Sequence, residues 1–395
     1  MVSTTIPISG SNSGSGSNSD DIIKAESAPQ IKDSTKVKPY AWIVNPWFDT
    51  MFVFGGALWL LFGLHFFVFG WNPSEVELPW RGAFAVSTLL IILSTLGQHL
   101  FADSHTVSTY MRIYATPESR KTFKLYAYYL PWCSLSLWTM ALLYREAAGM
   151  VIYIHLMWVF QHYVGQCYGI GLIYCYKQNY FMSKFERETF RWWMHSLSYF
   201  VIIRILTQRD FSPYFYYGVE VPFWGLPIWL YKLGEVFLAT MCILFAACIV
   251  RKYHRDKQFI PLPCLAVVGT VWAIGLSTGM ASAMVWIYGP PFFHGSQYLA
   301  VSLGYYIKEK GLPEGMIPKE IFVNWFKPRA LKYWAYVIMA GMFIYVFLPH
   351  FLMYFGLSFA LGASTIQACI NFHHFVSDAA IWRLRDPKCR DVLIA

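Results

Sequence analysis

The apolar stretch near the C-terminus carries polar side chains at regular intervals. Gln367, Asn371, His374 and Asp378 lie at offsets of 0, 4, 7 and 11, which places them along one face of a helix. His373 lies beside this face, about 100° round the helix. A His and an Asp four residues apart can both ligate one metal ion, or the carboxylate can orient the imidazole through a hydrogen bond.

Two more apolar stretches carry His together with amide side chains. His155, His162 and Gln166 lie at offsets of 0, 7 and 11, which is again one helical face. His294 precedes Gln297 by three residues, so the two lie on adjacent turns. Each stretch therefore predicts a helix that presents a His-bearing polar face to its neighbours.

A fourth stretch ends in a His and Asp pair. His99 and Asp103 are four residues apart and share a helical face. His105 follows two residues later, and it joins them only where the helix ends or bends. Ionisable groups within a membrane normally face the bundle interior and have partners, and one shared metal would satisfy several such faces together.

The residue types restrict which metal suits such a site. Neutral imidazoles with one or two carboxylates favour non-haem iron, with zinc, copper or manganese as alternatives. Glu is almost absent from the apolar stretches, which disfavours a ferritin-like di-iron site. The eight Cys form no C-x-x-C pair, so no thiolate site is indicated. The predicted metal ligands are His99, His105, His155, His162, His294, His373 and His374, and the candidate catalytic carboxylates are Asp103 and Asp378.

Other interpretations of these residues remain open. A single His within a membrane more often makes a hydrogen bond between helices than a metal bond. Asp103 and Asp378 also fit helix ends near basic loops, and His could be axial ligands to haem. Haem is less favoured because His155 and His162 share one helix, whereas two axial ligands come from different helices. The remaining His are interpreted as structural or solvated, namely His65, His195, His254 and His350.

The elements that must position these residues are membrane helices. Hydrophobic residues make up 56% of the 395 residues and charged residues only 13%, which leaves too few charges to cover a soluble globule of this size. Most apolar runs approach the ~20 residues needed to cross a bilayer. We therefore predict an all-α polytopic bundle of eight to ten spans, with the runs at 192–207 and 291–307 as the uncertain ones. The predicted spans are 50–70, 82–102, 125–144, 149–175, 192–207, 232–250, 260–288, 291–307, 333–356 and 359–381.

The loop charges predict how this bundle is oriented. Lys and Arg gather in alternate loops and after the last span, whereas the loops at 71–81 and 145–148 carry one Arg each. With ten spans, all basic loops and both termini lie on one side, which the positive-inside rule makes cytoplasmic. The Ser/Gly/Asn-rich residues within 1–38 predict a disordered tail ahead of an integral membrane domain at 39–395, in the cytoplasmic (inner) membrane. The net charge of +9 follows no amphipathic stripe, so no nucleic-acid partner is expected.

The dispersed His of this apolar chain resemble two families at the level of architecture. Membrane fatty-acid desaturases and hydroxylases combine an H-x3-4-H box with two H-x-x-H-H boxes. The chain has H-x5-H at His99 and His105 and one His pair at His373 and His374, without H-x-x-H-H. Its layout is also similar to that of the Brp/Blh-type carotenoid oxygenases, in which His from several helices hold one iron. These resemblances imply a membrane-embedded oxygenase, and they carry over no individual ligand.

Two functions from different classes follow from these observations. The first is a metal-dependent oxidoreductase that acts on a lipophilic substrate drawn from the surrounding membrane lipids, such as an acyl chain or an isoprenoid. Because the chain holds no nucleotide or flavin motif, its electrons would come from an electron-donor protein. The alternative is an ion- or proton-coupled transporter that uses the same His and Asp as a relay. The oxidoreductase is preferred because the sequence offers no matching interrupted helices in its two halves.

Overall fold

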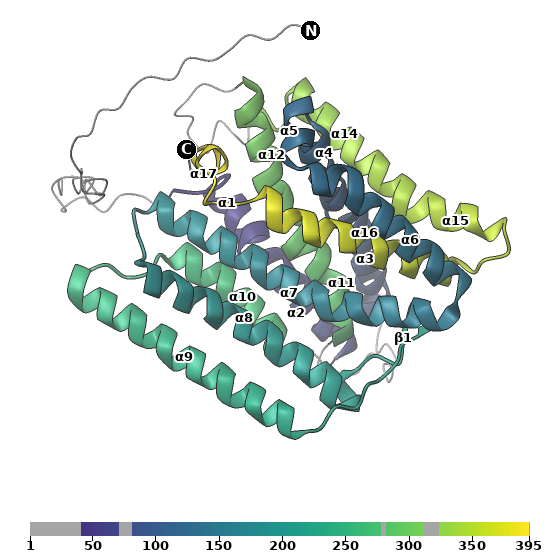
Figure 1. The fold of residues 1–395 in the computed structure, drawn as a ribbon, viewed down its shortest axis with the longest axis horizontal. Helices are drawn as coiled ribbons and strands as arrows, with labels where there is room; N and C mark the ends of the chain where they lie inside the picture. Colours follow the sequence, from purple (N-terminus) through teal and green to yellow (C-terminus); the bar gives the residue numbers. More distant parts are fainter. Residues whose placement is uncertain (1–40, 71–80, 278–281, 312–323, 395) are drawn as a thin grey trace, which may run out of the picture. The chain divides into compact units, whose positions relative to one another are not determined.

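The computed structural model describes residues 41–70, 81–277, 282–311 and 324–394, and the tail predicted at 1–38 lies outside them (Figure 1). The described part is all-α apart from a two-stranded antiparallel hairpin. In chain order, the first half contains α1 Pro46–Phe48, η1 Asp49–Val53, α2 Gly56–Phe69, α3 Arg81–Gly97, η3 Gln98–Asp103, α4 Ser104–Tyr114, α5 Pro117–Thr122, η4 Leu125–Tyr129, α6 Leu130–Leu143, α7 Arg145–Lys177 and α8 Lys184–Thr207. The second half contains η5 Arg209–Phe211, β1 Phe215–Tyr216, β2 Val219–Glu220, α9 Trp229–Asp256, α10 Leu262–Ser277, α11 Ser282–Gly289, η6 Pro290–Gly295, α12 Ser296–Gly311, α14 Pro328–Met342, η7 Phe343–Phe347, α15 Leu348–Met353, α16 Phe359–Ile381 and α17 Pro387–Ile394.

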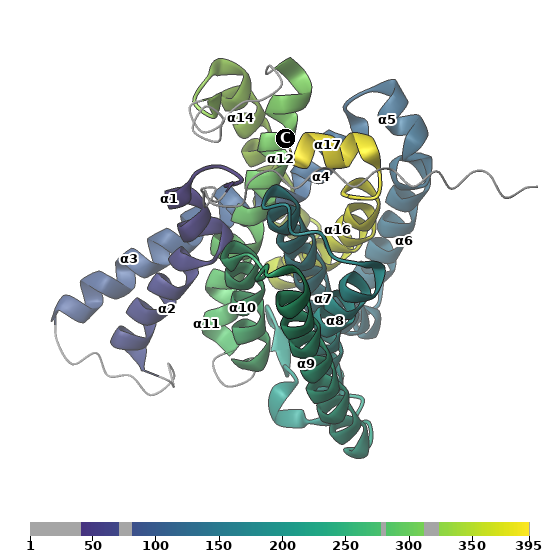
Figure 2. The same ribbon diagram turned by 90° about the vertical axis from the view of Figure 1, so that its left-hand side faces the viewer.

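Four helices in the described part are long and apolar enough to cross a membrane, which is consistent with an integral membrane protein. The pair Pro46–Val53 and Gly56–Val68, bent by 51°, makes a fifth if it counts as one span. These helices differ in how deeply they are buried. In Arg145–Lys177, 61% of the apolar stretch is buried inside the protein, against 17% in Trp229–Asp256. Accordingly α7 packs against α6, α8, α10 and α16, while α9 lies at the edge beside α8 (Figures 1 and 2). The four spans are Val86–Tyr114, Arg145–Lys177, Trp229–Asp256 and Pro328–Met353.

Several helices extend beyond the apolar runs that predicted them. The run at 192–207 is the C-terminal part of α8, which begins at Lys184 after a capping box. In this box Ser183 Oγ accepts from Glu186 N at 3.2 Å, and Glu186 Oε2 accepts from Ser183 N at 2.8 Å. The first two turns of α8 are therefore charged, and hydropathy alone misses them. The run at 359–381 coincides with α16, and its start is fixed by the side chain of the N-cap Ser358.

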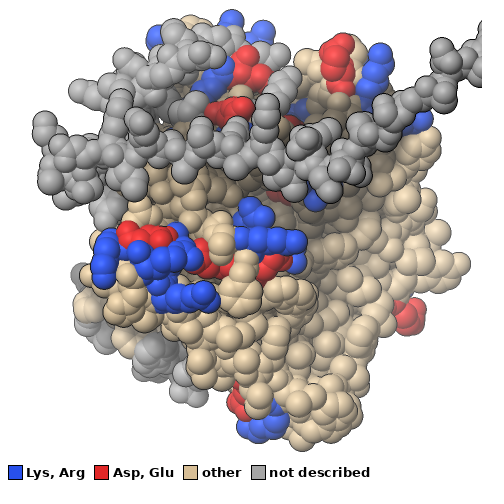
Figure 3. All heavy atoms as spheres, turned by 60° about the vertical axis from the view of Figure 1, so that its left-hand side comes forward, with Lys and Arg blue, Asp and Glu red and all other residues tan. Residues whose placement is uncertain are grey.

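Apolar side chains cover much of the outside of this helical unit as well as its core. Large residues exposed on α9 and on the α14–α15 segment include Leu233, Ile243, Met339 and Phe347. Figure 3 shows one face on which charged side chains gather in a few groups, separated by broad areas without charge. A soluble protein seldom exposes apolar area on this scale, whereas a lipid-facing surface requires it.

Two π-helical segments place polar residues where the predicted spans are interrupted. η3 continues α3 into α4, so the run predicted to end at residue 102 continues as one helix to Tyr114. η6 joins α11 to α12 and begins at the Pro290-Pro291 pair. The extra residue of a π turn rotates the following side chains relative to a regular helix. These turns carry His99 and Asp103 in η3 and His294 in η6.

Candidate metal centre

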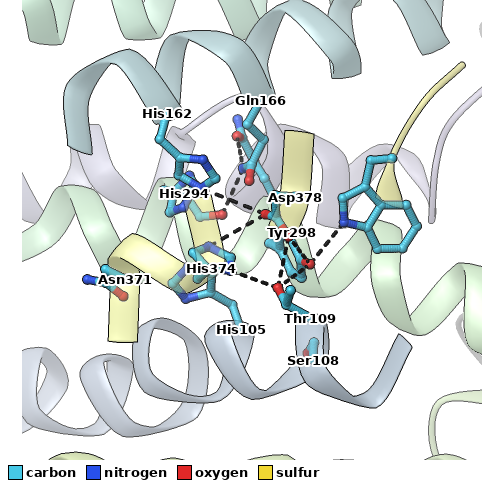
Figure 4. Close-up of polar contacts among 12 residues, drawn as sticks. His105, Ser108, Thr109, His162, Gln166, His294, Tyr298, Asn371, His374 and Asp378 are labelled. Atoms are coloured by element: carbon cyan, nitrogen blue, oxygen red, sulfur yellow. Dashed lines mark hydrogen bonds and ion pairs between the residues drawn. The ribbon is translucent and has the colours of Figure 1, made fainter. Parts of the chain in front are cut away.

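Four imidazoles from four separate elements surround one point inside the bundle (Figure 4). They are His105 on α4, His162 on α7, His294 on η6 and His374 on α16. The ring centroids of His105 lie 4.8 Å from His294 and 4.7 Å from His374. Those of His162 lie 4.8 Å from each of the same two rings. The four rings thus form a closed square, which we call the His cluster.

Each ring of the His cluster has a nitrogen without a hydrogen-bond partner among the described residues. The Nε2 atoms of all four His are buried without a hydrogen bond, and so is Nδ1 of His294. Ligand atoms of His105, His294 and His374 all lie within 4.8 Å of one another. A buried polar atom without a partner costs about 1–3 kcal/mol, and four such atoms gather here. These buried groups could hold a metal ion.

Hydrogen bonds on the far side of two rings fix which nitrogen carries the proton. Nδ1 of His105 donates to the carbonyl oxygen of Ala102, which can only accept. Nδ1 of His374 lies 2.7 Å from Thr109 Oγ1, and that hydroxyl donates in turn to Asp378 Oδ1 at 2.9 Å. Since the Thr109 hydrogen is directed at the carboxylate, the Thr oxygen accepts from His374. Both imidazoles therefore present an unprotonated Nε2 to the centre of the cluster, as a metal requires.

Asp378 lies where it could either ligate an ion or hold the ligands in place. Its Oδ1 accepts from Thr109 and, at 2.8 Å, from the Tyr298 hydroxyl. Its Oδ2 lies 3.5 Å from His374 Nε2 and 3.8 Å from His162 Nε2. His162, His374 and Asp378 form a second group whose ligand atoms lie within bonding reach of a common ion. The carboxylate is 8% exposed, so its charge needs such partners.

Amide side chains beside the His cluster fix the position of η6. Gln166 Nε2 donates to the backbone carbonyl of His294 and to Gln297 Oε1, both at 3.0 Å. Gln297 Nε2 donates to the backbone carbonyl of Val53 at 2.6 Å. Gln166 and Gln297 thus hold the backbone of a cluster residue instead of its ring. Asn371 lies apart from the cluster and accepts from the Tyr345 hydroxyl at 3.3 Å.

The predicted pair at the end of α3 forms, but outside the His cluster. His99 Nδ1 lies 2.8 Å from Asp103 Oδ2, and Gln98 Nε2 donates to Asp103 Oδ1 at 2.7 Å. Asp103 is 4% exposed and His99 is half-buried. The helix continues from η3 into α4, and His105 lies in the His cluster instead of beside this pair.

The structure places two other predicted ligands away from the cluster. His155 stacks on Phe375 with ring centroids 5.7 Å apart, and it lies two turns before His162 on α7. His373 lies about 100° round α16 from His374, and its Nε2 donates to the backbone carbonyl of Tyr126 at 2.9 Å. Neither belongs to a group of ligand atoms that could share an ion with the cluster.

Three residues at the centre were missed by the sequence analysis. Thr109 and Tyr298 bond Asp378, and Trp382 Nε1 donates to the Tyr298 hydroxyl at 2.9 Å. Thr109 and Tyr298 could have been predicted from the sequence, because each cluster His has a polar residue four positions later on the same helical face. The pairs are His105 with Thr109, His162 with Gln166, His294 with Tyr298 and His374 with Asp378.

A cavity of about 660 Å³ lies against the His cluster. His105 and His294 form part of its wall, together with the apolar side chains of Leu156, Val159 and Phe375. Its polar wall residues include Gln98, His99, Asp103, His155, Gln367 and Asn371. Cavities of this size accept small organic ligands. A molecule in it would lie next to the cluster and would meet both apolar and polar side chains.

A glycine permits the close helix contact that brings His105 and His294 together. A Cβ added at Gly295 would lie 2.6 Å from the carbonyl oxygen of Phe101 on η3. Gly295→Ala should therefore push η6 away from η3, destabilise the protein by about 1–3 kcal/mol and weaken metal binding. Thermal unfolding and metal content after purification measure both effects. Gly304→Ala on α12, where an added Cβ meets nothing within 4 Å, is the control and should change neither.

Comparison of the chain with family models, curated proteins and solved structures finds no match, so its function is argued from the geometry of the site.

Proposed function

We propose that this protein is a membrane-embedded, metal-dependent oxidoreductase, with non-haem iron at the His cluster and a lipophilic substrate in the adjacent cavity. The observation that carries this proposal is the shared wall: His105 and His294 belong both to the cluster and to the cavity of about 660 Å³. A substrate held there would lie next to the cluster that holds the metal.

The donor set is one that non-haem iron accepts. Four neutral imidazoles and one carboxylate suit non-haem iron, and zinc, copper and manganese accept the same donors. Haem fits poorly because four imidazoles gather at one place, whereas haem iron takes at most two axial ligands from the protein. Bound iron would supply the one-electron chemistry that reactions of dioxygen require.

The chain's own residues would bind and orient the reactants. The four cluster His would hold the ion, while Asp378 would either join them or, through Thr109, keep His374 in its ligating tautomer. Leu156, Val159 and Phe375 exclude water from the substrate. The His99–Asp103 pair faces the same cavity and is placed to exchange a proton with a polar group of the substrate.

The same proposal includes the arrangement in the membrane. Four or five helices are long and apolar enough to cross a membrane. We propose that further helices cross as well, which gives the predicted eight to ten crossings. The membrane is the cytoplasmic (inner) one, and both termini are cytoplasmic. The substrate then enters sideways from the membrane lipids, and an electron-donor protein supplies electrons from the cytoplasmic side.

Metal analysis of the purified full-length chain tests the proposal. We expect about one iron per chain, and consumption of dioxygen when a membrane lipid extract and a reductant are added. A metal-free preparation that is fully stable would overturn the proposal. Proton or ion flux in metal-free proteoliposomes that disappears in His162→Ala would instead support the transporter.

Filling the cavity should separate substrate binding from metal binding. Val159→Trp places an indole in the cavity wall, so lipid-dependent consumption of dioxygen should fall at least ~10-fold through lost substrate binding. Iron content should stay the same, because Val159 is not a ligand. Ile154→Trp is the control, since Ile154 is exposed on the same helix at 43% and should tolerate the indole. Unchanged turnover in Val159→Trp would exclude this cavity as the substrate site.

A further inference from the structure

Three aromatic side chains of the β1–β2 hairpin line the cavity of about 660 Å³ that lies against the His cluster. They are Phe215, Tyr216 and Tyr217. The strands pair Tyr216 with Val219, which is 6% exposed, so the hairpin is anchored in the protein through its second strand. The hairpin is therefore a defined part of the cavity wall.

The hairpin lies about 20 Å from the His cluster along two helices. On α7, a Cβ added at Gly149 would lie 2.6 Å from a carbonyl oxygen of β2, and His162 follows thirteen residues later. On α16, Ala360 Cβ lies 3.6 Å from a Cβ added at Gly218 in the hairpin turn, and His374 follows fourteen residues later. At a rise of about 1.5 Å per residue, both helices give the same separation of about 20 Å. A cavity lined by the hairpin and by cluster residues is therefore elongated.

Aromatic rings connect the hairpin with the His cluster along the cavity wall. The ring centroids of Tyr217 and Tyr216 are 4.7 Å apart, and those of Tyr216 and His155 are 6.4 Å apart. His155 stacks on Phe375 at 5.7 Å, and the Phe375 ring lies 4.3 Å from that of the cluster residue His162. Tyr217, Tyr216, His155 and Phe375 all line the cavity, so one continuous wall runs from the hairpin to the metal ligands.

Tyr217 holds an unfavourable backbone conformation at the end of this wall. The hairpin turn consists of Tyr217 and Gly218, with φ angles of 46° and 78°. A two-residue turn with two positive φ angles prefers Asn followed by Gly, because a bulky side chain is strained there. Backbone strain of this kind is typical of functional positions, and the ring of Tyr217 is 57% exposed and lies in the cavity wall.

The charges of the wall restrict what the elongated cavity accepts. Asp103 lines it, and no Lys or Arg is among the described residues that do so, which leaves an acid without a counter-charge. We propose that the hairpin sets the length of the substrate: an elongated, uncharged lipophile reaches the His cluster with one end, and its other end meets the rings of Tyr216 and Tyr217. This inference rests on the proposed function, and it adds a length limit with Tyr217 as the residue that determines it.

Photolabelling of the purified full-length protein in nanodiscs tests the length limit without turnover. The probes are 1-octanol, 1-dodecanol, 1-hexadecanol and 1-eicosanol, each with a diazirine in its hydrocarbon chain. Labelling at Gln367 and Asn371, which line the cavity, is divided by labelling of α9, which exposes apolar side chains to the lipid. This ratio corrects for the amount of probe in the bilayer, and it should fall at least ~5-fold beyond one length, because a longer probe collides with the hairpin. A ratio that does not depend on probe length would overturn the proposal.

Variants of the turn assign the limit to Tyr217. Tyr217→Gly removes the ring and also suits the positive φ, so the limit should move to longer probes while the unfolding temperature does not fall. Tyr217→Asn should give the same result, and Tyr217→Phe should keep the wild-type limit. Tyr214→Gly is the matched control and should leave the limit unchanged, because Tyr214 is 58% exposed and does not line the cavity. An unchanged limit in both Tyr217→Gly and Tyr217→Asn would refute the role of Tyr217.

The same measurement in His374→Ala separates this inference from the proposed function. His374 is a cluster residue that does not line the cavity, so the variant should lose the metal and keep the wild-type length limit. A length limit in a wild-type protein that binds no metal would contradict the proposed function alone. Bound metal without a length limit would contradict this inference alone.

Discussion

Replacing His374 by alanine is expected to remove the metal from the purified protein, whereas the same replacement at His373 should leave it bound. His374 presents an unpartnered Nε2 to the other three cluster His, while His373 lies about 100° round α16 and donates through Nε2 to the Tyr126 carbonyl. Loss of a ligand should cost more than the about 10–100-fold in affinity that is typical when a residue supporting a ligand is lost. Metal content measured by mass spectrometry should therefore fall from about one ion per chain to below about one tenth.

His373→Ala is a close control for His374→Ala because the two residues are adjacent on one helix. Both His are buried, both lie on α16, and both substitutions remove one imidazole, so any general effect on folding should be similar. Metal binding stabilises the folded state, and a chelator should therefore lower the unfolding temperature of the wild type and of His373→Ala. It should have no effect on His374→Ala. Equal metal content in the two variants would contradict the assignment of the cluster.

The sequence predicted the helices of the site well, because hydropathy and helical spacing are local properties. The run at 359–381 is α16, and the face that carries His374 and Asp378 is directed into the bundle as expected. Helical spacing could also have identified Thr109 and Tyr298, which follow His105 and His294 by four residues.

Shared faces alone did not predict which His converge. His155 and His162 share a face of α7, but seven residues separate them by about 10 Å along the axis, too far for one ion. His99 and His105 are six residues apart with a π turn between them, and only His105 reaches the cluster. How far along its helix each His lies relative to the other His depends on how the helices cross. Close contacts such as that between Gly295 and Phe101 determine this crossing, and residue spacing along the sequence does not reveal them.

Thr109 provides the sharpest test of how the site is held together. Thr109→Val keeps the shape of the side chain but removes the hydroxyl that bridges His374 Nδ1 and Asp378 Oδ1. The imidazole then loses the partner that fixes its tautomer and orientation, and we expect metal affinity to fall about 10–100-fold. Competition with a chelator of known affinity measures this change.

Thr109→Ser separates this hydrogen-bonding role from simple packing. The serine hydroxyl can still accept from His374 and donate to Asp378, so metal affinity should stay within about threefold of the wild type. Ser108→Ala is the control for loss of a buried hydroxyl on the same turn of α4, because Ser108 Oγ donates to the Ser104 carbonyl of its own helix at 3.3 Å. A packing role for Thr109 would give the reverse order, since valine preserves the volume that serine lacks. Metal affinity in the order wild type, Ser, then Val therefore supports the bridge, and weaker binding by the Ser variant than by the Val variant would refute it.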